Sequence, residues 1–181
     1  MIKIQGSVRR SFIFPAELPL AFAYYSDLSR VLPYLPHISL VRVYDHNHFR
    51  VLYNSTELQA YHIRVYCDVQ AQLDGEKKIL YVNPSNIAPP VETSADAQST
   101  TGQGRFSSRA VFRGRGAKTR IEYSLQLEAD LPPPLGLRLM PGVVVNRIAR
   151  NVTRRRMRET IVGFIERSMD AFPYWLDEMG Q

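Results

Sequence analysis

Four arginines in the last third of the chain have the spacing that most clearly suggests chemistry. Arg147, Arg150, Arg154 and Arg158 are three, four and four residues apart, so they share one face of a helix. A guanidinium group presents its N–H donors in a planar fork that matches carboxylate and phosphate oxygens. This cluster therefore predicts a site for an anionic group, such as the headgroup of an amphipathic ligand.

The apolar residues that follow on the same helix conflict with that cluster. At about 100° per residue they fall on the same side as the arginines; they are Ile161, Ile165, Met169 and Phe172. Four arginines without partners cannot be buried in a dry core. Either the helix breaks near Thr153 and changes phase, or the arginines line the mouth of a cavity or an exposed groove.

Further candidates lie in the apolar phases of predicted strands. Arg10 falls in the apolar phase of the alternation over residues 2–14. Either it reaches a ligand from inside, or the strand bulges or ends early at this position. Glu57 shares an inward phase with Tyr53, and its carboxyl is either a general acid or base or a hydrogen-bonded group at a strand end. The other aromatic residues predicted to line a ligand cavity are Phe106, Phe112 and Tyr123.

Other chemistries have little support in the sequence. The histidines and aspartate of residues 45–48 are typical of a polar turn rather than a metal site. Cys67 is the only cysteine, which excludes an intramolecular disulfide and a multi-cysteine zinc site. Phosphate-binding loops and nucleophile motifs are missing. We therefore predict no metal, no cofactor and no catalytic residue. A binding protein is favoured over a small-molecule enzyme, which would need polar residues that converge inside the cavity.

The elements that must position these residues follow from periodicity and turn signals. Strict alternation marks a first strand over residues 2–14, and Pro15 ends it. Two short helices follow in residues 16–36, and the chain ends in a long helix from Gly142 to about Met179, which Pro173 should kink or end. Between them we expect an antiparallel run of strands over residues 37–44, 49–58, 62–73, 79–83, 105–113 and 118–130.

Two connections are unusual. Residues 83–104 are rich in Pro, Ser, Thr, Ala and Gly and contain no basic residue, which predicts a long flexible loop, either a lid or disordered. Residues 131–141 are rich in Pro and Leu and predict a stiff, extended connector into the last helix. The leucines of this connector either pack under the helix or, beside the arginines, bind an anionic membrane surface.

The order of elements, together with the helix-turn Asp27 to Pro33, resembles the helix-grip fold of the START-like (SRPBCC) superfamily. Within it, the chain resembles a family of unknown function from cyanobacteria and plastids. The matching segments are Tyr81-Val-Asn-Pro84, Leu131-Pro-Pro to Leu139-Met-Pro141, and Asp170 to Trp175. The resemblance implies an α+β fold with a curved antiparallel sheet of about seven strands around the last helix, and an apolar cavity for a lipid, pigment or isoprenoid.

Composition and charge complete the expectation. The chain has 181 residues with a net charge of +6, and 45% of its residues are hydrophobic, which favours a single domain over residues 1–181. Of its 23 basic residues, 13 lie in residues 105–158, which hold only three acidic ones. We therefore predict a carrier of a hydrophobic molecule; the alternative is an adaptor whose basic face binds an acidic protein or an anionic membrane. Nucleic acid is an unlikely partner because outward aromatic residues are sparse. The expected location is cytoplasmic, with peripheral attachment to a membrane as a variant.

Overall fold

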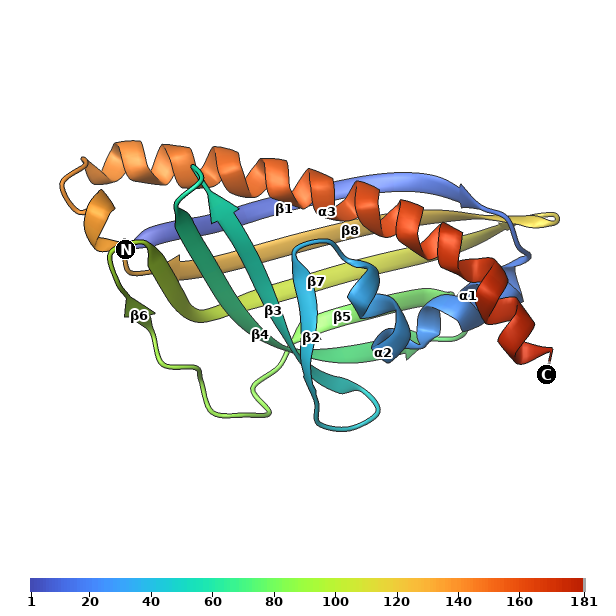
Figure 1. The fold of residues 1–181 in the computed structure, drawn as a ribbon. Helices are drawn as coiled ribbons and strands as arrows, with labels where there is room; N and C mark the ends of the chain where they lie inside the picture. The colour runs from blue at the N-terminus through green and yellow to red at the C-terminus, as the bar shows by residue number, and fades with distance from the viewer. Residues whose placement is uncertain (181) are drawn as a thin grey trace.

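A computed structural model describes residues 1–180 and forms one curved sheet gripping one long helix (Figure 1). The sheet order is β1-β8-β7-β5-β4-β3-β2, antiparallel except where β4 also pairs with β7 in parallel. The strands are β1 (Ile2–Phe14), β2 (Ile38–Val43), β3 (His48–Glu57), β4 (Tyr61–Asp74), β5 (Ile79–Pro84), β6 (Ser94–Ala95), β7 (Ser99–Arg115) and β8 (Lys118–Leu131). The helices are α1 (Leu18–Ser26), α2 (Leu28–Val31), the 3-10 turns η1 (Leu32–Tyr34) and η2 (Leu135–Leu137), and α3 (Gly142–Met179).

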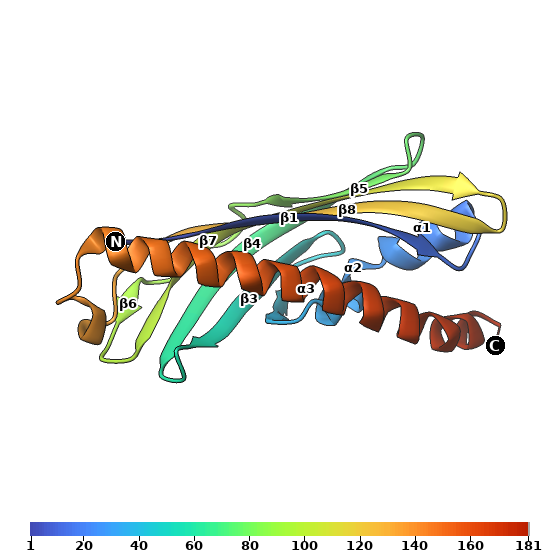
Figure 2. The same cartoon turned by 90° about the horizontal axis from the view of Figure 1, so that it is seen from above.

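The sheet bends so that β1 at one edge and β3 toward the other approach α3 from two sides (Figures 1 and 2). The alternation in β1 buries Ile2, Ile4 and Phe14 and exposes Lys3 and Gln5, as predicted. The short helices α1 and α2 cover the opposite end of the grip from the N-terminus (Figure 2). The curved antiparallel sheet and the long last helix were therefore predicted correctly.

Helix α3 is continuous through Thr153, so the predicted break there is wrong. Its buried residues step by four, from Val145 through Ala149, Thr153 and Met157 to Ile161. A step of four overshoots one helical turn by about 40°, so this buried stripe runs obliquely around the helix. At the arginine end the stripe therefore lies about 100° or more from the arginines, which face solvent. The arginines share an angular position with the apolar residues of the second half of α3. They are exposed nevertheless, because the buried stripe is not parallel to the helix axis.

Gly6 of β1 marks the closest approach of the sheet to α3. A Cβ atom there would lie 2.8 Å from Cγ2 of Thr153 and 2.9 Å from Cγ of Met157. Only glycine leaves room for this contact. Thr153 is small, and its buried hydroxyl is satisfied by donating to the carbonyl of Ala149 at 2.8 Å. We call this contact of Gly6 with Thr153 and Met157 the waist.

Residues 83–104 are more ordered than predicted. Ser94–Ala95 form β6, and Ser99 to Gln103 begin β7, where they pair in parallel with β4. The preceding residues 85–93, which we call the strap, are tied to β3 and β4. The Ser85 amide donates to the carbonyl of Asp68, and the Arg50 guanidinium donates to the carbonyl of Pro89. The strap is therefore fastened to the sheet instead of forming a free loop.

Two proline predictions also need correction. Helix α3 runs on to Met179 with Pro173 inside it, so this proline does not end the helix. The connector is not extended throughout, because one 3-10 turn, η2, follows Pro134. Of its leucines, Leu137 is half-buried against the core, whereas Leu135 and Leu139 are exposed.

Candidate ligand-binding site

The space between α3 and the sheet contains two separate hollows on opposite sides of the waist. The first, the central hollow, lies under α1 and α2 and reaches Phe12 of β1 and Phe164 of α3. The second, the end pocket, lies toward the start of β1 and α3 and reaches Ile4 and Ala149. The waist thus divides the grip into two compartments.

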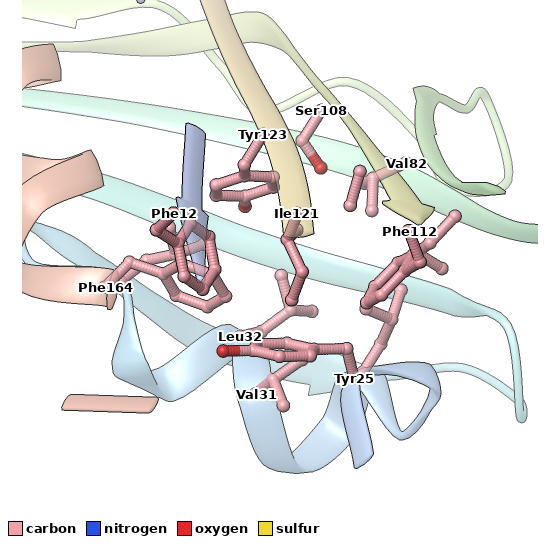
Figure 3. Close-up of a pocket in the computed structure, with 14 residues that line it drawn as sticks. Phe12, Tyr25, Val31, Leu32, Val82, Ser108, Phe112, Ile121, Tyr123 and Phe164 are labelled. Carbon is pink, nitrogen blue, oxygen red and sulfur yellow. The ribbon is translucent and has the colours of Figure 1, made fainter. Parts of the chain in front are cut away.

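The central hollow is nearly filled by its own side chains. The ring centre of Tyr25 lies 6.4 Å from that of Phe12, 5.8 Å from that of Phe112 and 5.9 Å from that of Phe164, and all four side chains line the hollow (Figure 3). Its free volume is about 20 Å³, which is room for about one water molecule. The large apolar cavity expected here is therefore closed in this conformation.

The polar groups of the central hollow are paired within the protein. The hydroxyls of Tyr25 and Ser168 are 2.8 Å apart. Burial raises the pKa of Tyr25 and of Tyr123 well above the ordinary value of 10.0, and a hydrogen bond with Ser168 or Ser108, respectively, opposes this only in part. Both side chains are therefore neutral phenols at physiological pH, and neither is a base.

The end pocket is larger and more apolar. Its free volume is about 80 Å³, enough for an apolar group of a few carbon atoms. Strands β1 and β4 and the Glu57–Tyr61 turn form one wall, and the first half of α3 and the connector form the other. The apolar lining residues are Ile2, Ile4, Leu58, Ile63, Pro134, Leu137, Met140, Val145, Ile148, Ala149 and Val152.

One carboxylate borders the end pocket. Glu57, which is 4% exposed, accepts a hydrogen bond from Nε of Arg156 at 2.8 Å, and Arg155 lies 3.5 Å away. Arg156 also donates to Glu159 at 2.7 Å, and Glu159 lies 3.1 Å from Nε2 of His37. The hydrogen bonds that Arg156 donates to Glu57 and Glu159 raise the pKa of Arg156 above its ordinary value. Of the two predicted roles for Glu57, the structure therefore favours the hydrogen-bonded group over the free acid or base.

Replacing Glu57 with glutamine should lower the free energy of unfolding by about 1.5–3 kcal/mol, because a charged hydrogen-bond acceptor of Arg156 is lost while Glu159 remains. Urea denaturation monitored by circular dichroism measures this. Glu166→Gln, an exposed position on the same helix, serves as the control and should change little. Equal stability of the two variants would contradict a stabilising role for the ion pair between Glu57 of β3 and Arg156 of α3.

The nine residues predicted to bind a ligand fall into three groups. Phe112 and Tyr123 line the central hollow. Tyr53 and Phe106 are buried in the core, and burial raises the pKa of Tyr53 to about 12. The arginines are all exposed, and none lines either hollow; they are Arg10, Arg147, Arg150, Arg154 and Arg158.

The exposure of Arg10 corrects its predicted inward role. It has the inward phase of β1, but β1 is the edge strand, and Arg10 and both its neighbours Arg9 and Ser11 are exposed. The residue opposite it on β8 is Tyr123, which is buried. The inward side of β1 is therefore uncovered at Arg10, between the half-buried Val8 and Phe12, and an inward phase there does not imply burial.

Sequence reasoning missed Arg156 and the residues at the mouth of the end pocket. Arg156 does not fit the spacing of the arginine cluster. Its separation of three residues from Glu159 was the one feature of the sequence that indicated an ion pair. Leu58 occupies a tight turn with Gln59, where asparagine and glycine are the usual residues, so no pattern marked the hairpin. Leu137 was predicted to pack under the helix or to bind a membrane surface, and Met140 was not predicted to line a pocket.

Comparison with solved structures decides the fold. The protein TTHA0849 from Thermus thermophilus superposes with a TM-score of 0.54 at 17% identity over 91% of this chain and 98% of that one. The Zhui aromatase/cyclase from Streptomyces sp. R1128 gives 0.57 at 10% identity, covering 93% and 94%. Human STARD10 gives 0.50 at 10% identity, covering 95% of this chain and 66% of that one.

The chain has the START-like helix-grip fold. The neighbours belong to the START/SRPBCC superfamily, and at these identities the likeness concerns the fold alone. No protein-family model matches the sequence, and no curated protein matches it. In this helix-grip structure the residues from 1 to 180 include no cluster of three or more potential metal ligands. Over the same residues, no helix is long and apolar enough to cross a bilayer.

Proposed function

We propose that the chain binds a hydrophobic or amphipathic small molecule whose apolar part enters the end pocket. The observation that carries this proposal is the composition of that pocket, an apolar hollow between helix and sheet with one carboxylate at its border. Pockets of this kind, mostly apolar with few polar groups, are typical of ligand sites. The helix-grip fold supports the proposal, since its interior suits hydrophobic ligands.

The volume of the end pocket limits how binding can occur. About 80 Å³ holds a short apolar group, so a longer chain has to displace side chains. Leu137 and Met140 are the movable part of the wall, because they belong to the short connector and not to the sheet. Lipid, isoprenoid and pigment tails are all narrow enough for this route. Resemblance to the cyanobacterial and plastid family makes quinones, pigments and thylakoid lipids the first candidates within this proposal.

The proposal treats residues 1–181 as one binding domain with a cytoplasmic location. The exposed arginines leave the alternative of an adaptor open. Arg147, Arg150 and Arg154 present an unshielded basic face, and the nearly filled central hollow also fits a protein without an internal ligand. Such an adaptor would bind an acidic protein surface through charge complementarity.

Two alanines provide a matched test of the ligand site. Ala149→Leu adds volume to the end pocket, and Ala110→Leu adds the same volume to the central hollow. With a fluorescent fatty acid as the probe, Ala149→Leu should weaken binding by about tenfold or more, because overpacking costs about 1–3 kcal/mol. Ala110→Leu should leave probe affinity within about twofold. The opposite order would move the site to the central hollow.

Native and denaturing mass spectrometry of protein purified gently from its own source complete the test. An additional mass that denaturation releases is expected for a carrier and gives the ligand class. Probe binding that neither alanine variant alters, combined with an empty native protein that co-purifies with a defined acidic complex, would instead support the adaptor.

A further inference from the structure

We propose that the end pocket opens onto an anionic lipid bilayer, on which the protein docks through an exposed apolar tip. The tip consists of Leu135, Leu139, Met140, Val143 and Val144. The role of the end pocket in this inference rests on the proposed function. The docking is argued from the exposed residues of the tip and does not depend on any ligand.

The five exposed apolar side chains of the tip lie within ten consecutive residues, 135–144. Leu139 is 97% exposed and Val143 is 77% exposed, although both are large apolar residues. They lie where the connector enters α3, at one extreme end of the molecule (Figures 1 and 2). Single exposed apolar residues are ordinary, but a contiguous group marks an interaction surface.

The tip is continuous with the end pocket. Met140 belongs to both, since it is part of the exposed group and also lines the pocket. Pro134 and Leu137 line the pocket from the same connector that carries Leu135 and Leu139. An apolar chain that leaves the tip therefore meets apolar surface until it reaches the pocket interior.

Leu58 extends the apolar surface across the mouth of the pocket. It lines the pocket, yet it is 62% exposed and has a positive φ of 51°, followed by Gln59 at 61°. A left-handed backbone is unfavourable for leucine, and glycine or asparagine would relieve the strain in this turn. The turn itself requires the left-handed backbone, but it does not require an exposed leucine, and contact with an apolar medium explains that side chain.

The charges around the tip match the layered chemistry of a membrane surface. Residues 131–158 contain seven arginines and no acidic residue. Val143 lies on the outer side of α3 with Arg147 and Arg150, which are about 6 and 10 Å further along the axis. Apolar side chains of peripheral proteins enter the interface by about 5–10 Å. With the tip inserted, these two guanidinium groups reach the level of the phosphates.

A bilayer explains these features better than an acidic protein does. Along the axis of α3 the apolar tip comes first and the arginines follow. In a bilayer, hydrocarbon and then phosphate follow in the same order from the centre outward. A guanidinium binds phosphate oxygens with two parallel bonds. A protein partner would explain the charge but would need a separate apolar hollow to receive Leu139 and Val143.

The test uses vesicles of phosphatidylcholine with and without phosphatidylglycerol, and co-sedimentation of the full chain. Binding should require phosphatidylglycerol. Leu139→Asp with Val143→Asp should weaken it by at least about tenfold, because burial of one such side chain contributes about 1.5–3 kcal/mol. Arg147→Glu with Arg150→Glu should weaken it by about 30-fold, at about 1 kcal/mol per arginine.

Each double variant has a matched control elsewhere on the surface. Val41→Asp with Val43→Asp changes exposed valines on the edge strand β2. Arg115→Glu with Lys118→Glu makes the same charge change at the β7–β8 turn, at the far end of the molecule from the tip (Figure 1). Both controls should bind vesicles within about threefold of the original protein. Loss of binding equal to that of the tip variants would overturn the proposal, as would binding without phosphatidylglycerol that the tip variants leave unchanged.

A Leu139→Trp variant reports insertion directly. Its emission should shift to the blue on vesicles and be quenched by lipids that carry bromine on the acyl chain, over a constant background from the buried Trp175. Binding of an acidic protein to the arginines without this quenching would assign the face to a protein partner and overturn membrane docking.

The two proposals fail separately. If only the docking is wrong, the protein does not bind vesicles. Ala149→Leu then still weakens binding of the fluorescent fatty acid, measured without vesicles. If only the ligand site is wrong, vesicle binding depends on the tip, while probe affinity is the same in the original protein and in Ala149→Leu.

Discussion

Replacing Asp68 with alanine is expected to lower the free energy of unfolding by about 3–5 kcal/mol, the usual effect of removing one partner from a buried ion pair. The Asp68 side chain lies on the outward phase of β4, yet the residue is only 2% exposed. Its two carboxylate oxygens accept bonds from Arg50 at 2.7 and 2.8 Å, and Gln103 donates to it at 3.2 Å. Without the carboxylate, the largely covered Arg50 guanidinium loses its counterion.

The strap should loosen in the same variant. Arg50 donates to the carbonyl of Pro89, and the Val91 amide donates to Gln103, so both side chains held by Asp68 also hold the strap. Denaturant titration measures the stability, and limited proteolysis measures the strap, where new cleavage is expected in residues 85–93. Asp130→Ala, an exposed aspartate on β8, should remain within about 0.5 kcal/mol. A loss below about 1 kcal/mol for Asp68→Ala would contradict the buried pair.

The thiol of Cys67 should react about a thousandfold more slowly in the folded protein than in the unfolded chain at pH 8. Burial, helped by the neighbouring Asp68 charge, raises its pKa from 9.0 to about 12. The thiolate is the reactive form, and a pKa of about 12 instead of 9.0 removes about 99.9% of the thiolate at pH 8. The raised pKa keeps the folded rate low at pH 8, and this rate should increase about tenfold per pH unit until the pH approaches 12.

Reaction with a colour-forming disulfide reagent, with and without denaturant, measures both rates. Because the chain has one cysteine, the signal needs no assignment, and Cys67→Ser provides the blank. A folded-state rate within about tenfold of the unfolded one would show that β4 opens readily at this position.

The sequence was most informative where one periodicity decided the structure. The alternation in residues 2–14 and the Asp74-Gly75 turn led to β1 and to the β4–β5 hairpin, because side chains of opposite polarity must point to opposite faces. Helix α3 was predicted from Gly142 to about Met179 and has those bounds. Its arginine face was misplaced, because the course of a stripe around a helix depends on the surface that the helix crosses.

Long-range pairings were beyond the reach of local pattern. The strap depends on Asp68, which occupies an outward phase and looked like a solvated residue. The parallel pairing of His62 to Tyr66 with Ser99 to Gln103 joins segments that no turn connects. For the candidate site, the aromatic residues Phe112 and Tyr123 were correctly placed facing inward, but the end pocket depends on how the connector folds back, which its prolines did not specify.

The pairing of the first strand with the last has a consequence for how the chain is made. Ile2 lies opposite Leu131, and Gly6 meets Thr153 and Met157, so β1 has neither its neighbour nor its cover until most of the chain exists. At roughly 5–20 residues per second, synthesis of the 103 residues between β1 and β8 takes about 5–21 s. During that time the apolar side of β1 lacks its partners, and chaperones that hold nascent chains can bind it. Moving β1 to follow α3 by circular permutation would put these partners next to one another in time as well as in space.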